Sequence, residues 1–496
     1  MSEEKPASPP DGIARHTVKG SAYSVTSSAV TLGLGLARKI LMLRWLLPEM
    51  VGVGSAALLL LDLATQIGTI GIHSAYVHRK DTDENVRATY FTMNLGLTAV
   101  SLLVLALFLP LVTRFYPNYP QLGLVVLAYM GIEVVKAFNM PQMTMMSKNL
   151  AFGQLAMVDV VSSVVMTMVG PTMAWMGFGV WSLVGENLSG VLTRGVMFWA
   201  IYRPWRPRLG WDRGIVRWFW EYGIKIWWSS NLTYVLNNFD ELWTSSFLGP
   251  ISLGFYANAY DFATYSRKVV ANPILSVFFP TFAHLQADKL RLSRAFFRAT
   301  SLMVRVGCLF SLIFILTAPE FIHLLGEQWV PMQTTFQLMI VYTLFDPLSL
   351  AAQNLLAATG YPGSVLRIRI IQTIIFIPAV IILSFVGGIE GVALATDLMI
   401  LVGAVLLFRE TYRVTEYSSR ALWFWPLASM VVTGGVVFGL TSFWASLNLW
   451  AAFLLKLILI PMLYGLLLLL TEREQLLTGW NMLWGMVRPR LKMSDS

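Results

Sequence analysis

The chain has 496 residues, of which 56% are apolar and only 13% carry a charge. A soluble domain has about 45–50% apolar and about 25% charged residues, so this composition excludes a disordered chain and argues against a soluble enzyme. The mean hydropathy of +0.63 over the whole length indicates a polytopic membrane protein. The single cysteine, Cys308, excludes an internal disulfide and a cysteine-based metal site, and we predict no cofactor.

The predicted elements begin after a polar segment. Residues 1–19 are rich in proline and lack the apolar core of about 7–15 residues that a secretory signal needs, so we predict a flexible cytoplasmic tail. A membrane-spanning helix needs about 20 mainly apolar residues. Fourteen such segments follow, near residues 20–42, 51–75, 89–112, 120–140, 153–173, 178–200, 222–247, 252–280, 299–320, 335–358, 366–386, 390–408, 424–445 and 450–470.

The end of the chain, residues 472–493, has too few consecutive apolar residues to cross a membrane. Trp480 and Trp484 lie four residues apart, and basic residues follow them. This pattern is typical of an amphipathic helix on the inner leaflet, and a frayed tail is the alternative.

The positive charges predict the orientation, because cytoplasmic loops are rich in lysine and arginine. With the N-terminus inside, 25 basic residues fall in inner segments, whereas the short outer loops hold only Arg44 and Arg114. We therefore interpret the net charge of +9 as basic cytoplasmic loops and predict no nucleic-acid partner. An even number of spans then places both termini in the cytoplasm. We predict that the protein resides in the cell (inner) membrane.

The chain resembles itself at an offset of about 200 residues. Residues 48–52 match residues 250–254, and residues 179–183 match residues 391–394, which aligns Glu186 with Asp397. The order of these matches predicts a duplicated six-span unit. Parallel repeats of this kind occur in transporters that bind substrate between two halves.

These patterns predict an all-α polytopic membrane protein with two pseudo-symmetric lobes and two additional helices. The predicted divisions are a tail at 1–19, an N-lobe at 20–209, a C-lobe at 210–410, two further spans at 411–471 and a cytoplasmic amphipathic tail at 472–496.

About nine basic and nine acidic residues fall inside the predicted spans. Each charge facing lipid at the bilayer centre costs about 2.5–3.5 kcal/mol, so most must face a cavity, form a pair or reach the interface. We expect Lys225, Arg194 and Arg305 to reach the interface and Glu133 to pair with Lys136.

Four bases have no simple structural explanation: Arg38, Lys39, Arg267 and Lys268. Because guanidinium and ammonium groups bind phosphate, these residues predict a cavity for an anionic substrate. Amide and aromatic residues, whose groups can bond and stack on sugars, crowd spans 7 and 8, and Asn237 and Tyr260 are among them. We predict that these two residues and the acidic Asp240 also bind substrate in the cavity. An interfacial aromatic belt with amide bonds between helices is the alternative.

Three carboxylates, Asp62, Asp346 and Asp397, lie near the middle of their spans. A carboxylate is costly there when ionised, so we predict that these residues couple transport to a cation or proton. The alternative is that each pairs with a base and holds its helix in place. The chain has no phosphate-binding loop that would supply ATP hydrolysis, and neither Gly-x-Ser-x-Gly nor His-Glu-x-x-His is present.

Several phrases, in order, resemble one family, the oligosaccharide flippases of the MOP superfamily, in particular the Wzx-type branch. The phrases are Leu47-Pro48-Glu49 with Gly52, His78-Arg79-Lys80-Asp81, Phe91-Thr92-Met93-Asn94-Leu95, Gly177-Phe178-Gly179-Val180-Trp181-Ser182-Leu183, Trp205-Arg206-Pro207-Arg208-Leu209, Leu248-Gly249-Pro250, Leu253-Gly254-Phe255-Tyr256, Phe279-Pro280-Thr281-Phe282 and Gly326-Glu327-Gln328-Trp329. The resemblance covers residues 20–410.

The resemblance implies two six-helix lobes around a cavity, and transport of a polyprenyl-diphosphate-linked oligosaccharide between leaflets for exopolysaccharide or lipopolysaccharide biosynthesis. It also implies contact with membrane lipid and with a polysaccharide polymerase or export machinery. Arg267 and Lys268 depart from the family, which has a more apolar stretch there. The alternatives are a cation or drug antiporter, a flippase of the peptidoglycan lipid precursor, and an enzyme such as a glycan polymerase. An enzyme of that class needs larger outer loops than this chain has.

The predicted topology can be tested with introduced cysteines. A cysteine at Asn118 should react with a membrane-impermeant thiol reagent in intact cells, whereas a cysteine at Arg208 should react only after permeabilisation. The reverse labelling pattern would contradict the orientation derived from the charges.

Overall fold

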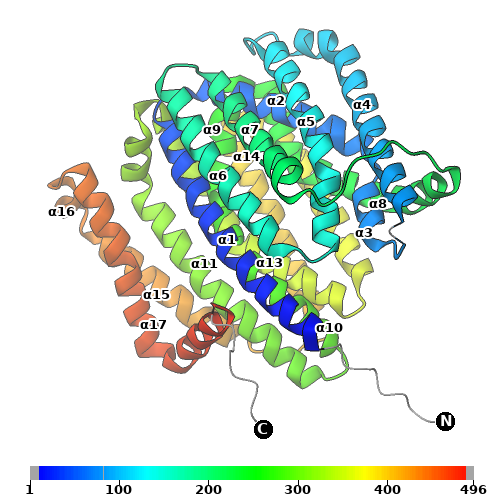
Figure 1. The fold of residues 1–496 in the computed structure, drawn as a ribbon. Helices are drawn as coiled ribbons and strands as arrows, with labels where there is room; N and C mark the ends of the chain where they lie inside the picture. Colours follow the sequence, from blue (N-terminus) through cyan, green and yellow to red (C-terminus); the bar gives the residue numbers. More distant parts are fainter. Residues whose placement is uncertain (1–10, 82, 488–496) are drawn as a thin grey trace, which may run out of the picture.

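The structure is a computed structural model that describes residues 11–81 and 83–487, with side chains described from 26 to 476 except at positions 82, 229, 232, 270, 276 and 277. In these residues the chain forms α-helices and short 3-10 and π-helical turns, and it contains no β-strand (Figure 1). The predicted all-α class is therefore confirmed.

We describe the helices in three groups. The N-half contains α1 (Asp11–Leu43), α2 (Pro48–Gly68), α3 (Ile72–His78), α4 (Glu84–Phe115), α5 (Leu122–Lys148), α6 (Phe152–Trp175), α7 (Val180–Val196) and η1 (Met197–Tyr202). The C-half contains α8 (Arg213–Trp243), η2 (Thr244–Leu248), α9 (Gly249–Ala263), η3 (Arg267–Ala271), α10 (Asn272–His284), α11 (Lys289–Leu325), η4 (Glu327–Met332), α12 (Gln333–Leu338), α13 (Ile340–Ala358) and α14 (Pro362–Thr411). The C-terminal hairpin contains α15 (Ser419–Gly439), α16 (Thr441–Ala445) and α17 (Leu449–Val487).

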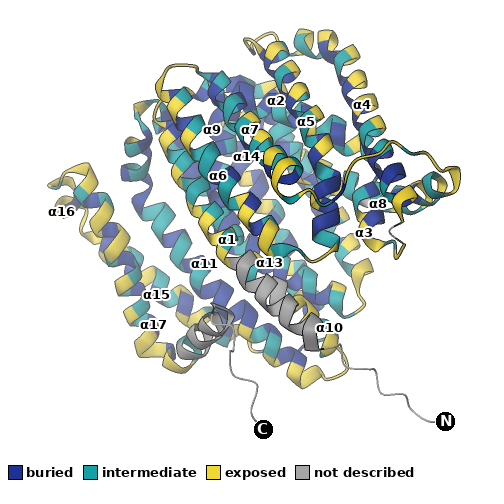
Figure 2. Cartoon of the chain, viewed as in Figure 1, coloured by how far each residue is buried: buried dark blue, intermediate teal, exposed yellow. Residues whose placement is uncertain are grey.

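Many of these helices suit a membrane. Eight described helices are long and apolar enough to span one, and a ninth span results if η4–α12 and α13, which meet at a 48° bend, are counted together. Figure 2 shows exposed residues along α4 and α17, and large apolar side chains such as Leu107 and Leu470 are among them. Faces of this kind suit contact with lipid. The protein is a multi-pass membrane protein, and its helices are consistent with fourteen spans.

The first helix begins earlier than predicted. α1 starts at Asp11, so residues 11–19 are helical and do not form the flexible tail that the sequence suggested, while residues 1–10 lie outside the described residues. A proline pair precedes α1, and an acidic first residue suits the positive end of a helix.

Three loops end in a capped helix. The Asp212 carboxylate accepts the backbone N–H of Ile215 at 2.9 Å at the start of α8. Asp288 caps α11 in the same way at 3.0 Å, and the Ser418 hydroxyl caps α15. These side chains satisfy N–H groups that a helix cannot pair itself, which is why the helices begin directly after them.

One predicted span is interrupted where α2 meets α3. Ile70 and Gly71 have φ angles of 42° and 61°, and such a value is uncommon for a β-branched residue. Gly223 of α8 packs on this break so closely that a Cβ there would overlap the Ile70 carbonyl oxygen. α8 of the C-half therefore packs against the N-half at this break.

The repeat is visible in the backbone. Gly179, before α7, has φ 57° and ψ −130°, and Gly388, inside α14, has φ 54° and ψ −130°. Gly388 separates the two spans that α14 contains. The structural counterpart of Gly179 is therefore Gly388, whereas the sequence match had chosen Gly391, which is helical.

The two halves meet through residues that the repeat relates to each other. A Cβ on Gly52 of α2 would overlap the Pro250 carbonyl oxygen of α9, and a Cβ on Gly254 would overlap the Pro48 carbonyl oxygen. The matched Pro-and-Gly turns therefore contact one another reciprocally, as two copies do across a pseudo-two-fold axis. Only glycine permits such close approach of two backbones.

Two hydrogen bonds flank this contact with the same reciprocity. The Trp329 indole N–H donates to the Leu43 carbonyl oxygen at 2.7 Å, and the Tyr119 hydroxyl donates to the Ser245 carbonyl oxygen at 2.6 Å. Each bond joins a loop of one half to the end of the first long helix of the other. We call this set of contacts the closed end.

The C-terminal hairpin packs on α11. Lys456 of α17 pairs with Glu320 at 2.6 Å, and Arg305 pairs with Glu472 at 2.5 Å, with all four side chains largely buried. Arg305 is 3% exposed, so the expectation that it reaches the interface is wrong. A buried ion pair is lost at high cost when one partner is removed, so both pairs hold the hairpin to the C-half.

The glycine contact between the halves predicts a sharp difference between two glycines. We expect Gly52→Ala to destabilise the protein by about 1–3 kcal/mol or more, because its Cβ would meet backbone that no rotamer can move away. Gly33→Ala, whose Cβ meets nothing within 4 Å, is the control. Fluorescence-detected gel filtration after heating should show a lower melting temperature for Gly52→Ala alone, and equal values would contradict the close contact.

Candidate functional site

Polar side chains gather in three interior cavities. One lies in the N-half and has a volume of about 340 Å³, one lies between the halves with about 300 Å³, and one lies in the C-half with about 60 Å³. We call them the N-cavity, the central cavity and the C-cavity.

The central cavity is formed by helices of both halves. α1 supplies Arg38 and Lys39, α7 supplies Glu186, and α9 supplies Asn258 and Asp261. Two adjacent residues of α1 thus carry positive charge into the cavity, and an acidic residue from each half faces them.

Arg38 is held within the N-half. Its Nε lies 2.7 Å from a Glu186 oxygen, and both side chains are less than one-fifth exposed. The Arg38 Nη1 atom is buried and has no hydrogen-bond acceptor among the described residues. A guanidinium can donate five hydrogen bonds, so this group keeps donor capacity at the cavity wall.

Lys39 links the halves. Its ammonium donates to an Asp261 oxygen at 2.6 Å, from α1 of the N-half to α9 of the C-half. Lys268 of η3 approaches the other Asp261 oxygen at 3.5 Å. One carboxylate therefore contacts two ammonium groups.

The C-cavity contains most of the remaining candidates. Arg267 pairs with Asp346 at 3.1 Å, and the Tyr260 and Tyr342 hydroxyls lie 2.9 Å apart. The same cavity is lined by Asn237, Asp240, Gln353, Arg369, Gln372 and Thr396. Arg369, which the charge count placed in an inner loop, lines this cavity because α14 starts at Pro362.

Asp240 and Asp397 have defined partners near this cavity. The Tyr256 hydroxyl donates to Asp240 at 2.5 Å and lies 2.9 Å from the Thr396 hydroxyl. Asp397 accepts the backbone N–H of Tyr342 at 3.0 Å, in the first turn of α13. This carboxylate thus caps a helix from outside, a role that the sequence did not predict.

The N-cavity contains Asp62, together with Glu133, Lys136, His73 and Tyr234. Glu133 and Lys136 pair at 2.9 Å, as predicted from their spacing. His73 Nδ1 lies 2.6 Å from the Tyr90 hydroxyl. Asp62 has no lysine, arginine or histidine within 4.0 Å among the described side chains.

The structure therefore divides the predicted site. Arg38 and Lys39 line the central cavity and Lys268 lies beside it, next to Asp261, whereas Asn237, Asp240, Tyr260 and Arg267 line the C-cavity. Glu186 and Asp261 were counted among the acidic residues inside the spans but were not identified as the partners of the α1 bases. The repeat gave no valid signal, because the register that pairs Gly179 with Gly388 aligns Glu186 with Ala395.

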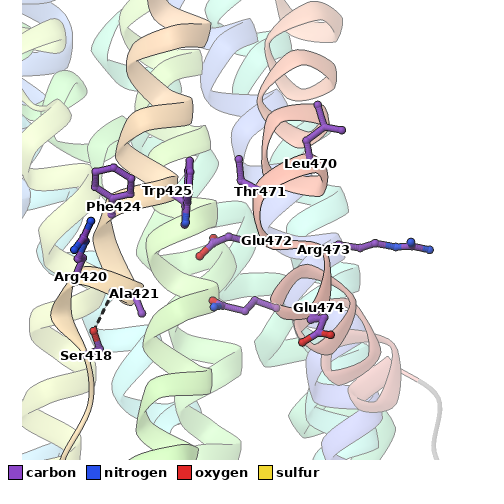
Figure 3. A pocket seen from close by; sticks show the side chains of 11 residues that line it. Ser418, Arg420, Ala421, Phe424, Trp425, Leu470, Thr471, Glu472, Arg473 and Glu474 are labelled. Atoms are coloured by element: carbon purple, nitrogen blue, oxygen red, sulfur yellow. Dashed lines mark hydrogen bonds between the residues drawn. The ribbon is translucent and has the colours of Figure 1, made fainter.

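A fourth and larger cavity, of about 600 Å³, lies between α15 and α17. Figure 3 shows Glu472 pointing toward α15, where Trp425 lies, while Arg473 points away. Because Glu472 is already paired with Arg305, this cavity offers no converging set of free charges. It marks the base of the hairpin.

The chain is similar to known proteins of polysaccharide biosynthesis. The chain is 24% identical over 402 residues to the lipopolysaccharide biosynthesis protein WzxC of Escherichia coli (strain K12). This alignment covers 79% of this chain and 80% of the relative. It is 24% identical over 318 residues to the succinoglycan biosynthesis transport protein ExoT of Rhizobium meliloti (strain 1021), covering 64% of each.

Solved structures show the same fold. The lipid II flippase MurJ in an inward closed conformation has a TM-score of 0.72 at 13% identity and covers 92% of this chain and 100% of that chain. A multidrug resistance MATE family transporter of the MOP superfamily, facing inward, has a TM-score of 0.55 at 13% identity and covers 78% and 98%.

The match to a family model is the most direct of these findings. It extends over residues 41–334, more than half of the chain, and includes α2 and α9, which contact each other. Two of the four charged partners at the central cavity, Glu186 and Asp261, lie inside this match, whereas Arg38 and Lys39 directly precede it. The family is described as "Polysaccharide biosynthesis protein". The chain belongs to this family of polysaccharide biosynthesis proteins.

Proposed function

We propose that the protein is a flippase that moves a polyprenyl-diphosphate-linked oligosaccharide from the inner to the outer leaflet of the cell (inner) membrane. The transported unit would serve exopolysaccharide or lipopolysaccharide biosynthesis. The observation that carries the proposal is the central cavity, where two bases of α1 and carboxylates from both halves meet in a chain of this family. In this proposal the protein is a transporter and not an enzyme, because moving the substrate between leaflets requires no catalysed reaction.

The physical problem of such transport is the headgroup. A sugar diphosphate is strongly hydrated and cannot cross hydrocarbon, whereas its polyprenyl chain can remain in lipid. A cavity between two membrane-embedded halves supplies polar surroundings, and Arg38, Lys39 and Lys268 supply positive charge for the phosphates. Asn237, Asp240, Tyr260 and Arg267 would contact the sugar or the phosphates when the C-cavity widens.

Alternating access requires that the halves separate at one end and join at the other. In the predicted topology the closed end faces outside and both termini lie in the cytoplasm. The reciprocal Gly52 and Gly254 contacts and the two hydrogen bonds beside them would then hold the outer side shut. They would have to break for the headgroup to leave.

The three carboxylates proposed to couple transport to an ion gradient differ in their surroundings. Asp346 is paired with Arg267, and Asp397 caps α13, so both already have a structural task. Asp62 faces the N-cavity without a close basic partner among the described side chains. Among the three, Asp62 is therefore the group best placed to take up and release a cation or proton.

A second candidate function is transport of another substrate by the same fold, either a peptidoglycan lipid precursor or a cationic drug. The fold similarity to MurJ favours the former as the rival. Deleting the gene separates these functions: loss of surface polysaccharide with normal cell-wall growth supports the proposal. Normal polysaccharide together with arrested peptidoglycan synthesis contradicts it.

The phosphate-binding role predicts which single variants fail. Arg38→Ala, Arg267→Ala and Lys268→Ala should each reduce polysaccharide export by at least about tenfold at unchanged protein level, since each removes a charge-assisted contact. Arg38→Lys should be only partly tolerated, because an ammonium lacks the paired donors of a guanidinium. Arg194→Ala, at an exposed pair with Asp159, is the control. Normal export by all three alanine variants would show that these bases do not hold phosphate.

The coupling role predicts a gradient-dependent defect. In sealed vesicles, transport should accelerate with an imposed pH or Na⁺ gradient, and Asp62→Asn should abolish this acceleration while binding of substrate persists. Asp346→Asn and Asp397→Asn serve as comparisons, and Asp159→Asn controls for loss of a carboxylate elsewhere. If transport ignores both gradients and all three variants match the parent, the carboxylates are structural.

A further inference from the structure

At the edge of the central cavity, Asp261 contacts two lysines, Lys39 in the cavity wall and Lys268 beside it. We propose that Lys39 and Lys268 form a diphosphate-binding site that the Asp261 carboxylate occupies in the empty protein, so that an incoming diphosphate displaces Asp261 and breaks the ion pair between the halves. The identity of the ligand as a lipid-linked diphosphate rests on the proposed function. The displacement itself rests on the geometry of these three residues.

The carboxylate of Asp261 can be reached and exchanged. Its side chain is 52% exposed, whereas those of Lys39 and Lys268 are 18% and 35% exposed. The contacts are unequal, at 2.6 Å to Lys39 and 3.5 Å to Lys268. A singly charged carboxylate therefore sits at the open side of two ammonium groups, and a diphosphate carries more charge and more acceptor oxygens to the same place.

Aromatic rings hold the two ammonium groups independently of Asp261. The Lys39 Nζ atom lies 4.9 Å from the centroid of the Phe262 ring, and the Lys268 Nζ atom lies 5.1 Å from that of Tyr265. Contacts of this length are within the range of cation–π attraction. The ammonium groups thus keep their positions when the carboxylate leaves, which is what a preorganised anion site requires.

Arg38 adds a donor beside this cluster. Its Nε is held by Glu186 at 2.7 Å, and its buried Nη1 atom has no acceptor among the described residues. A buried donor without a partner is unfavourable, and a ligand oxygen in the cavity would satisfy it. A diphosphate has two phosphoryl groups, so one can replace Asp261 while the other accepts from Arg38.

Lys268 belongs to this site and Arg267 does not, because adjacent residues of a helix point in different directions. Although the two residues are adjacent, Arg267 pairs with Asp346 in the C-cavity and Lys268 approaches Asp261 at the central cavity. The Arg38–Glu186 pair stays within the N-half, whereas Lys39–Asp261 joins the halves. Diphosphate binding would therefore remove a tie between the halves and leave the tie inside the N-half intact.

The test measures binding of inorganic diphosphate and of farnesyl diphosphate to the purified full-length protein in phosphatidylcholine nanodiscs, by calorimetry. Asp261→Asn should bind both probes about tenfold more tightly, because a competitor that occupies the site most of the time lowers the apparent affinity in proportion. Lys39→Gln and Lys268→Gln should each weaken binding by about tenfold. Asp261→Glu, which keeps the competing charge, should stay within about twofold of the parent.

Asp159→Asn is the matched control, since it removes a carboxylate that pairs with Arg194 away from the cavity, and its affinity should not change. If Asp261→Asn binds inorganic diphosphate no more tightly than the parent, displacement is wrong. If that variant does not fold, Lys268→Gln decides the question, because it loses only the longer contact, and unchanged affinity contradicts the site.

The two probes also separate the sources of the ligand. Tighter binding of farnesyl diphosphate supports a lipid-linked ligand, and a preference for inorganic diphosphate overturns it. Failure here is distinguishable from failure of the proposed function. A protein that exports polysaccharide without the expected affinity changes contradicts displacement alone, whereas the expected binding in cells whose polysaccharide does not depend on the gene contradicts the flippase.

Discussion

The close contact between α2 and α9 is the constraint on which the arrangement of the two halves depends. At Gly52 and Gly254 the helices approach until backbone meets backbone, and the facing carbonyl oxygens belong to Pro250 and Pro48. In lipid there is no hydrophobic force between helices, so tight packing at small residues and hydrogen bonds must supply the association. The Trp329 and Tyr119 bonds provide the latter on either side. Because the contact is reciprocal, one duplicated motif produces both sides of it.

The charges inside the helices follow from the same need for internal partners. Arg38, Lys39, Arg267, Arg305 and Lys456 each face a carboxylate on another helix. Four of these pairs join helices within one half or anchor the hairpin, and one, Lys39–Asp261, joins the halves. A charge that holds two moving parts together in the absence of ligand can release them when a ligand takes over its partner. In the proposed mechanism, the Lys39–Asp261 pair therefore contributes both to stability and to transport.

The helical class, the spans and the existence of a repeat could be predicted from sequence, because each depends on periodic or local patterns. Residues 48–52 and 250–254 predicted the duplication, although not that the two turns touch. The division of the candidate bases between two cavities could not be predicted. It depends on which helices pack against each face of this segment, since Arg267 pairs with Asp346 of α13 whereas the adjacent Lys268 approaches Asp261 of α9. The start of α1 at Asp11 was not predicted, because hydropathy was the only criterion and the first turns of this helix are polar.

The anchoring of the C-terminal hairpin also affects the bilayer around the protein. Lys456 pairs with Glu320 and Glu472 pairs with Arg305, so these two ion pairs fix α17 along α11. The hairpin therefore moves with the C-half and enlarges that side of the protein alone. The rocking parts thus have unequal footprints in the membrane, and a tilt of equal angle displaces more lipid on the side of the C-half. Acyl-chain order and lateral pressure then enter the free-energy difference between the two access states, and the thickness and fluidity of the host membrane become variables of the transport cycle.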